Sequence, residues 1–127
     1  MSKPKILIVD DSQLNRELLA CMLEDNYDIC EAENGEQAVE ILERCHKDFK
    51  LVLLDLIMPV MDGYQVLAVM KAKQWLDMLP VICISSETSG DSIRRVYRLG
   101  ASDYFSRPFD AMTVFIALRV RLRCMTR

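Results

Sequence analysis

The segment Leu51-Val52-Leu53-Leu54-Asp55 is a run of four apolar residues that ends in a carboxylate. Such a run is typical of a buried strand with one reactive group at its carboxyl end. Three more apolar runs lead into polar groups: residues 5–9 into Asp10-Asp11, residues 81–84 into Ser85-Ser86, and residues 104–105 toward Arg107. Because the carboxyl ends of parallel strands meet along one edge of a sheet, we expect these polar groups to gather there.

Strand and helix patterns alternate along the whole chain. Strands are predicted at 5–9, 27–32, 51–55, 81–84 and 102–106, and helices after Ser12, at 36–44, at 64–73, from Ser89 to Gly100 and from Asp110 to about 123. Ser12 is the predicted N-cap of the first helix, where Leu14, Leu18, Cys21 and Met22 follow at helical spacing. Crossovers of this length are right-handed, so the pattern predicts a doubly wound α/β fold, (βα)5, with helices on both faces of a parallel five-stranded sheet.

Length and composition indicate one globular domain. The chain has 127 residues, of which 51% are hydrophobic and 28% charged. We expect residues 1–127 to form a single domain, and an output domain, where one exists, to follow from about residue 119. No apolar segment approaches the roughly 20 residues of a membrane span, and no signal-peptide pattern precedes the first strand. We therefore expect a cytoplasmic setting and no membrane partner.

The cysteines and the single histidine show no ligand spacing. Five cysteines, an odd number, lack any Cys-x-x-Cys pair, so we interpret them as mostly buried apolar residues in a reducing compartment. They are Cys21, Cys30, Cys45, Cys83 and Cys124. His46 lies in a polar segment and is predicted to be a surface residue.

Charge is divided unevenly along the chain. Residues 1–92 hold 8 Lys or Arg against 17 Asp or Glu, whereas residues 93–127 hold 8 Arg against 2 Asp. The basic part is either a solvated helix face or a docking surface for an acidic partner or a second subunit. Direct nucleic-acid binding is not expected, because no recognition motif accompanies the arginines.

Asp10, Asp11 and Asp55 are the candidate site. Three ionised carboxylates at one edge repel each other, and a hard divalent cation removes that conflict. Mg²⁺ prefers carboxylates, water and phosphate oxygens, whereas a zinc site would need Cys or His ligands at suitable spacing. A carboxylate can also become an aspartyl phosphate. The pattern predicts Asp55 as nucleophile, with Asp10 and Asp11 on Mg²⁺ and with Ser85 and Arg107 as donors to phosphoryl oxygens.

Four motifs, in this order and spacing, resemble the receiver domain of bacterial two-component response regulators over essentially the whole chain. They are Ile8-Val9-Asp10-Asp11, Asp55-Leu56-Ile57-Met58-Pro59 followed by Met61-Asp62-Gly63, Ser85 after an apolar strand, and Arg107-Pro108-Phe109. The resemblance implies a flavodoxin-like fold. It also implies a phosphorylation-controlled signalling switch that catalyses only its own phosphorylation and dephosphorylation.

The resemblance assigns a role to each site residue. Asp55 would be the phosphoacceptor. Mg²⁺ would be bound by Asp11 directly, by Asp10 through water, by Asp55, and by the backbone carbonyl of Ile57. Ser85 would be the switch hydroxyl and Tyr104 the switch aromatic.

The implied partners are a histidine kinase or phosphotransfer protein as phosphodonor, and a downstream output domain or protein. The face made by the fourth helix, fifth strand and fifth helix would change shape on phosphorylation, and it could form a homodimer. Arg94, Arg95, Arg98 and Arg119 populate this part of the chain and are candidate contacts for the downstream partner.

Two positions depart from the family pattern. Arg107 stands where a lysine is usual, which puts in question the efficiency of phosphorylation and its coupling to the switch. Ser86 stands where Ala or Gly is common. The resemblance further implies a cis bond between Arg107 and Pro108, and the apolar Ile57 predicts slow loss of the phosphoryl group, since it cannot orient an attacking water.

Three other functions are compatible with parts of this pattern. A haloacid-dehalogenase-type phosphatase needs a second acid two residues after the nucleophile, where this chain has Ile57. A flavodoxin-type electron carrier needs a phosphate loop after the first strand, where Asp10 and Asp11 would repel a phosphate. The remaining alternative is a degenerate receiver, a binding module that works without phosphorylation, for which Arg107 is the only support.

Overall fold

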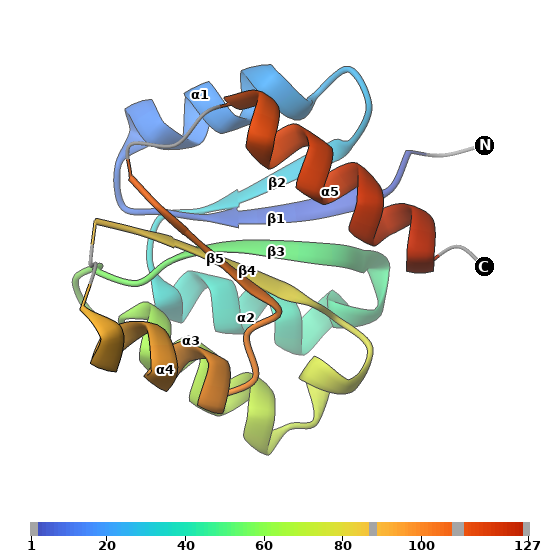
Figure 1. The fold of residues 1–127 in the computed structure, drawn as a ribbon. Coiled ribbons are helices and arrows are strands. Elements are labelled where there is room, and N and C mark those ends of the chain that lie inside the picture. Colours follow the sequence, from blue (N-terminus) through green and yellow to red (C-terminus); the bar gives the residue numbers. More distant parts are fainter. Residues whose placement is uncertain (1–2, 87–88, 108–110, 126–127) are drawn as a thin grey trace.

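A computed structural model describes residues 3–86, 89–107 and 111–125. Its strands are β1 (Lys5–Val9), β2 (Asp28–Ala32), β3 (Phe49–Asp55), β4 (Val81–Ser85) and β5 (Asp103–Ser106). They form one parallel sheet in the order β2-β1-β3-β4-β5 (Figure 1). This confirms the predicted fold. From β1 the chain continues to β2 on one side in the strand order, and from β3 it continues to β4 on the other side. The space between β1 and β3 is therefore the topological switch point.

The helices are α1 (Gln13–Leu23), α2 (Gly35–Cys45), α3 (Gly63–Ala72), α4 (Gly90–Arg98) and α5 (Ala111–Met125). Figure 1 shows α1 and α5 on one face of the sheet and α2, α3 and α4 on the other. Four helices begin at a side chain that accepts a hydrogen bond from the backbone N–H three residues on: Ser12, Asn34, Asp62 and Ser89. The predicted N-cap Ser12 is therefore confirmed, whereas Asp110 and Pro108 lie outside the described residues.

The strands divide their side chains between two cores. In β3, Leu51 and Leu53 pack with the residues under α1 and α5, whereas Val52 and Leu54 pack with those under α2, α3 and α4. The alternation follows from strand geometry, which points successive side chains to opposite faces. Because both faces are covered, the run stays apolar throughout. Asp55 ends this run where the sheet ends.

The spacing of apolar residues marks the first helix but not its buried face. Leu19 and Leu23 are the buried residues of α1, while Leu14, Leu18 and Cys21 are exposed. The segment carries apolar residues around much of its circumference, and contact with the sheet and with α5 selects which of them are covered. The buried face thus depends on neighbours that are remote in sequence.

His46 and the cysteines differ in part from expectation. The His46 ring stacks on Trp75 at 5.1 Å between centroids, and its Nδ1 lies 3.0 Å from the Leu42 carbonyl oxygen. It is half-buried against Trp75 and so is less exposed than the sequence predicted. Cys83 is buried, Cys30 and Cys45 are half-buried and Cys21 is exposed; these four are free thiols. The side chain of Cys124 lies outside the described part.

In the part of the chain that is described, no helix combines the length and the apolar character that crossing a bilayer requires.

Candidate functional site

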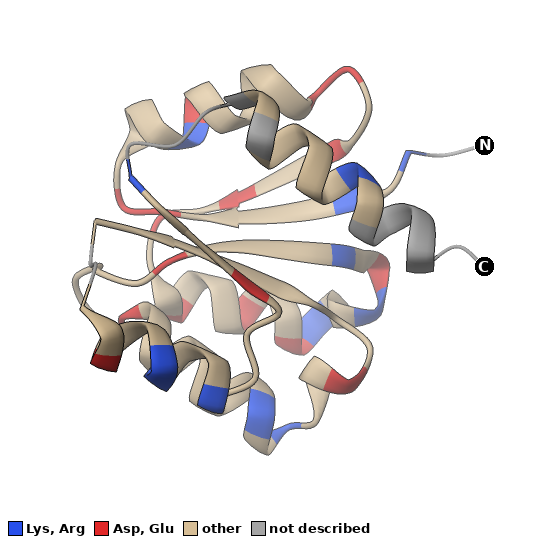
Figure 2. Ribbon diagram, in the orientation of Figure 1, with Lys and Arg blue, Asp and Glu red and all other residues tan. Residues whose placement is uncertain are grey.

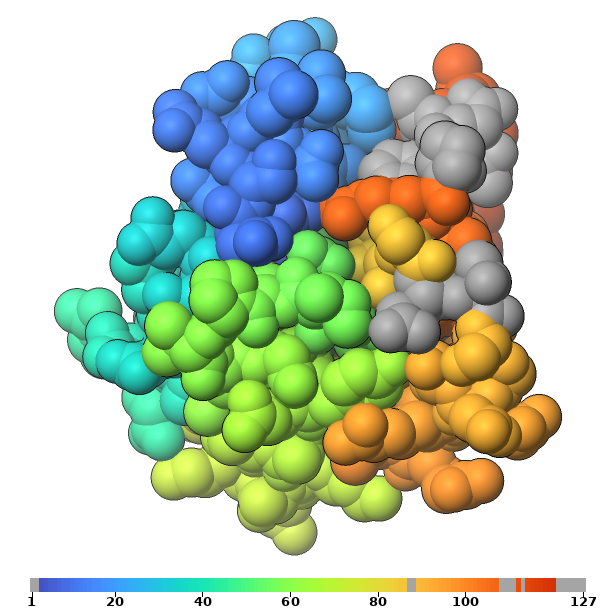
Figure 3. Space-filling view, turned by 90° about the vertical axis from the view of Figure 1, so that its left-hand side faces the viewer, coloured from blue at the N-terminus to red at the C-terminus, as the bar shows by residue number. Residues whose placement is uncertain are grey.

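The carboxyl edge of the sheet collects the polar groups that follow the strands. Asp10 and Asp11 come directly after β1, and Asp55 and Ser85 end β3 and β4. Arg107 follows β5, and its backbone N–H donates to the Ser85 carbonyl oxygen at 2.8 Å. Figure 3 faces this edge and shows the start of α1, the loop after β3 and the end of β5 converging on it. The site therefore sits at the β1–β3 switch point, where folds of this topology bind ligands.

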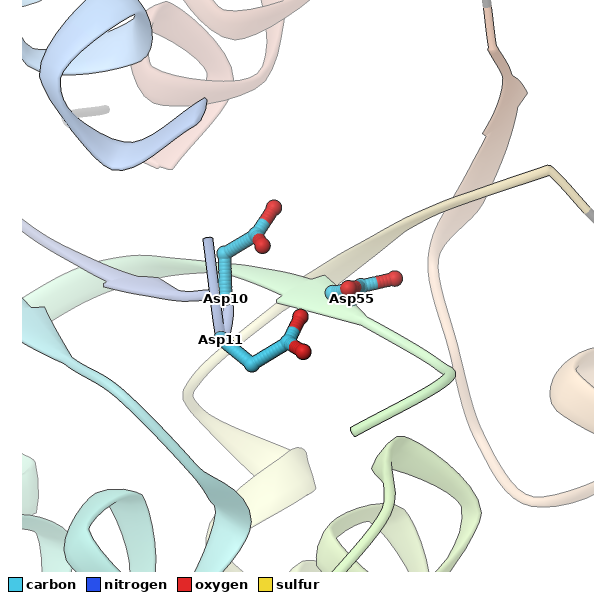
Figure 4. Close-up of side chains that lie close together, drawn as sticks. All are labelled: Asp10, Asp11 and Asp55. Atoms are coloured by element: carbon cyan, nitrogen blue, oxygen red, sulfur yellow. The ribbon is translucent and has the colours of Figure 1, made fainter. Parts of the chain in front are cut away.

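The three aspartates form one acidic cluster. One carboxylate oxygen from each of Asp10, Asp11 and Asp55 lies within 4.8 Å of the others. Asp10 and Asp55 are only 1% and 5% exposed, while Asp11 is exposed (Figure 4). The cluster thus has two carboxylates fixed in the protein and a third that faces solvent. Such a set of oxygen donors suits a small hard cation.

Burial raises the pKa of Asp55. Removal from water, followed by the nearby charge of Asp10, raises the pKa of Asp55 from 3.8 to about 6. The guanidinium of Arg107 and the backbone N–H of Ile57, which lies 3.4 Å from Asp55 Oδ1, act in the opposite direction. Near neutral pH the carboxylate is therefore ionised at a cost in free energy. A bound cation would relieve that cost.

Arg107 reaches from β5 across the site. Its Nη2 donates a hydrogen bond to Asp10 Oδ2, and its Nη1 lies 3.7 Å from Asp55 Oδ1. The other oxygen of Asp10 accepts from the Ser12 N–H at 2.9 Å. Both oxygens of Asp10 are therefore engaged within the protein.

The remaining predicted site residues lie near the cluster or on the adjoining strands. Ser85 is fully buried at the end of β4, next to β3. Ile57 is 55% exposed in the loop that follows Asp55. Tyr104, in β5, is half-buried and packs against the core on the α4 side of the sheet. The structure therefore brings Asp10, Asp11, Asp55 and Arg107 into one cluster, with Ser85 at the adjoining strand end, and places Tyr104 one strand further along.

Sequence analysis missed a residue that holds the acidic turn. Arg16 in α1 is largely buried, its Nη1 donates to the Asp10 carbonyl oxygen at 2.7 Å, and its Nε lies 3.1 Å from Glu31 in β2. Arg16 is four residues after the N-cap Ser12, so one helical turn places it back over the end of β1. The spacing of four residues from Ser12 is the sequence feature from which the role of Arg16 could have been predicted.

The loop from β3 to α3 is held close to the end of β3. The Gly63 N–H donates to the Leu56 carbonyl oxygen at 2.9 Å, and Met61 N–H donates to Pro59 at 2.8 Å across Val60, whose φ is 71°. A hydrogen bond that spans one residue at positive φ marks a strained γ-turn. Gly63 itself has no positive φ, so a turn conformation is not what requires glycine. A Cβ there would lie 2.5 Å from the Asp55 carbonyl oxygen.

Comparison with known proteins agrees with this fold. A family model, the response regulator receiver domain, matches residues 6–119. The chain is 36% identical to the transcriptional regulatory protein ResD of Bacillus subtilis over 96% of its length, and 33% identical to the chemotaxis protein CheY of Halobacterium salinarum over 90%. These alignments cover 49% of ResD and 92% of CheY. The chain thus spans about half of the length of ResD.

A solved structure supports the same assignment. The signal receiver domain of a signal transduction histidine kinase from Syntrophus aciditrophicus matches with a TM-score of 0.88 at 29% identity, covering 98% of this chain and 93% of that one. This structure and the family model that matches residues 6–119 indicate the same family. The chain belongs to the receiver domain family of two-component response regulators.

Proposed function

We propose that this domain is a phosphorylation-controlled switch in which Asp55 accepts a phosphoryl group with Mg²⁺ bound. The observation that supports this most directly is the cluster of Asp10, Asp11 and Asp55 at the switch point, with oxygens within 4.8 Å of one another. Asp55 is the best acceptor because it ends the central strand β3, between the two aspartates that follow β1 and the Ser85 hydroxyl of β4.

The cluster fits Mg²⁺. Two ligands of one octahedral Mg²⁺ lie roughly 3 to 4 Å apart, so oxygens within 4.8 Å need only small side-chain adjustments. Asp11 and Asp55 would bind the ion directly, Asp10 would act through water, and the Ile57 carbonyl would supply a backbone oxygen. When bound, the ion neutralises the carboxylates and a phosphoryl oxygen. No Cys or His belongs to the described cluster, which is consistent with a hard cation.

The transfer itself requires positioning and charge neutralisation. A carboxylate oxygen of Asp55 forms the bond to phosphorus, while the bond from phosphorus to the donor histidine nitrogen breaks and that nitrogen keeps the electron pair. A histidine kinase or a phosphotransfer protein would supply the donor. Arg107 offers a planar pair of N–H donors to the phosphoryl oxygens, and Ser85 offers a hydroxyl.

Phosphorylation would act on the face made by α4, β5 and α5. Contacts from Ser85 and Arg107 to the phosphoryl group would bias a pre-existing two-state equilibrium, with Tyr104 following the hydroxyl. A downstream output domain or protein, or a second copy of this domain, would recognise the changed face. The proposal includes a cytoplasmic signalling pathway and no catalysis beyond the phosphorylation and dephosphorylation of the domain itself.

The basic residues of this face are not equally available to a partner. Figure 2 shows the arginine positions along α4 in blue. The guanidinium of Arg95 lies 4.1 Å from the ring centroid of Tyr64 in α3, a cation–π contact, and Arg94 pairs with Asp91. Arg95 therefore ties α4 to α3. We propose Arg98 and Arg119 rather than Arg95 as the contacts for an acidic partner.

The test of the proposed function is uptake of phosphate from a small-molecule donor. Incubated with acetyl phosphate and Mg²⁺, the protein is expected to gain one phosphoryl group by intact mass, and to gain none in EDTA. Hydroxylamine should remove the group, since it cleaves acyl phosphates and leaves phosphoserine intact. Light scattering on the same samples reports whether phosphorylation changes the oligomeric state.

One observation keeps the degenerate receiver as a second candidate. Arg107 replaces the usual lysine and engages Asp10 as well as approaching Asp55. A protein that binds Mg²⁺ but gains no phosphoryl group would favour a phosphorylation-independent binding module. Arg107→Lys would then be the variant to examine next.

An Ile57→Asn variant is expected to lose its phosphoryl group faster than the natural protein. Ile57 lies two residues after Asp55 and is 55% exposed, so its side chain borders the solvent side of the site without any group that could orient water. An amide would orient that water, which should raise the hydrolysis rate by about tenfold. The measurement is the decay of intact phosphorylated mass after removal of the donor.

Ile57→Val is the matched control, because it changes the side chain without adding a hydrogen-bonding group. Its decay rate should equal that of the natural protein. If the Asn variant also decays at this rate, Ile57 has no part in the lifetime of the phosphorylated state.

A further inference from the structure

The side chain of Arg107 occupies the acidic cluster as a cation would. It pairs with Asp10 and lies 3.7 Å from Asp55, and only 21% of the side chain is exposed. Together the three aspartates carry three negative charges when ionised, and this guanidinium is the cation paired with two of them among the described residues. Of the two oxygens of Asp10, one accepts from Ser12 and the other from Arg107.

The backbone of Arg107 is fixed while its side chain spans the site. Its N–H donates to the Ser85 carbonyl oxygen at 2.8 Å, which anchors the residue beside the end of β4. From there the side chain reaches Asp10, which follows β1. The planar fork of arginine can serve two carboxylates at once, whereas a lysine ammonium is a single point charge.

A cation at the cluster conflicts with this arrangement. Two positive groups a few ångströms apart repel strongly where water is largely excluded. Asp10 Oδ2 also has to turn from Arg107 toward the ion or its water. Binding of the ion and the Asp10–Arg107 pair therefore compete for the same carboxylate.

We propose that Arg107 is an internal counter-cation of the acidic cluster, which Mg²⁺ must displace from Asp10 in order to bind. This inference rests on the proposed Mg²⁺ site. It makes Arg107 a positioning residue with two states: paired with Asp10 when the ion is absent, and released when the ion is present. The released guanidinium is then available to phosphoryl oxygens at Asp55, so metal binding prepares the donor that the transfer uses.

The first test is the affinity for Mg²⁺ alone, measured by titration calorimetry. The single Trp75 precedes β4 and so lies at the opposite edge of the sheet, which makes its fluorescence a poor reporter of the site. Arg107→Gln is expected to tighten Mg²⁺ binding by about tenfold, the scale of one hydrogen bond to a charged group. Arg107→Lys, which keeps the charge but not the fork, should bind more tightly than the natural protein and less tightly than Arg107→Gln.

Arg94→Gln is the matched control for net charge. It removes one positive charge from an exposed arginine of α4 that pairs with Asp91. Its Mg²⁺ affinity should equal that of the natural protein. Equal affinity in the natural protein and in Arg107→Gln, or no binding by either, would overturn the proposal.

A second test observes the guanidinium of the natural protein directly by NMR. Without metal, the Nη protons of Arg107 should give separate, slowly exchanging signals, because the pair with Asp10 restricts rotation of the group. Saturating Mg²⁺ should collapse these signals, and signals that persist unchanged at saturation would refute displacement. Neither test involves a phosphodonor. If Mg²⁺ displaces Arg107 but the protein takes up no phosphate, the result counts against the proposed function and not against the displacement.

Discussion

An Asp55→Asn variant should gain no phosphoryl group from acetyl phosphate under conditions that label the natural protein completely. The amide keeps the shape of the carboxyl group but offers no anionic oxygen to attack phosphorus. The same variant should unfold at higher urea concentration than the natural protein at pH 7.5 in EDTA. Its free energy of unfolding is expected to rise by about 1 to 2 kcal/mol, because the buried charge is gone.

The pH dependence of that gain follows from the direction of the shift. Burial and Asp10 raise the pKa of Asp55 to about 6 in the folded protein, from 3.8. A raised carboxyl pKa means that the folded state binds the proton more tightly than the unfolded chain. Its contribution to stability is present below pH 4 and is lost as the pH rises through about 6. The advantage of the variant should therefore be small at pH 4 and fully developed at pH 7.5.

Asp91→Asn is the control for both measurements. Asp91 has a side chain that is 93% exposed and pairs with Arg94 on the surface of α4. This variant should be labelled like the natural protein, and its stability should change little at either pH. If Asp55→Asn still gained a phosphoryl group, a residue other than Asp55 would be the phosphoacceptor. An equal gain in stability at pH 4 and pH 7.5 would mean that the ionisation of Asp55 is not its cause.

The features that sequence analysis located are local in the chain. A buried parallel strand is a short apolar run, and the polar residue that ends it marks the edge of the sheet. For this reason Asp10, Asp55 and Ser85 could be assigned to one edge before any coordinates existed. N-caps are equally local, since Ser12 and the N–H that it accepts from are three residues apart.

The features that it missed depend on residues remote in sequence. The pair between Arg107 and Asp10 joins positions 97 residues apart, so no spacing rule could reveal it. Which apolar residues of α1 are buried depends on contact with the sheet and α5. The Trp75 ring stacked on His46 comes from the segment before β4. At position 63 the neighbours in space, and not the backbone φ, require a residue without a side chain.

Gly63→Ala should be among the most damaging single-methyl changes in this protein. An added Cβ would lie 2.5 Å from the Asp55 carbonyl oxygen and 2.7 Å from the Leu56 Cα, both atoms of the backbone. These atoms cannot move aside without shifting the end of β3 or the start of α3. We expect a loss of about 3 kcal/mol in the free energy of unfolding, measured by urea denaturation. Because Asp55 would shift with its own carbonyl, phosphate uptake should fall as well.

Gly90→Ala makes the same chemical change where the surroundings can yield. Gly90 begins α4, and a Cβ there would meet only the end of the exposed Arg94 side chain, at 3.2 Å. That side chain can turn away, and alanine favours the helix, so stability should stay the same or rise by up to about 1 kcal/mol. If Gly63→Ala and Gly90→Ala changed the free energy of unfolding by the same amount, helix propensity would account for both changes. A loss confined to Gly63→Ala would show that the close approach of α3 to the backbone of Asp55 is what requires glycine at this position.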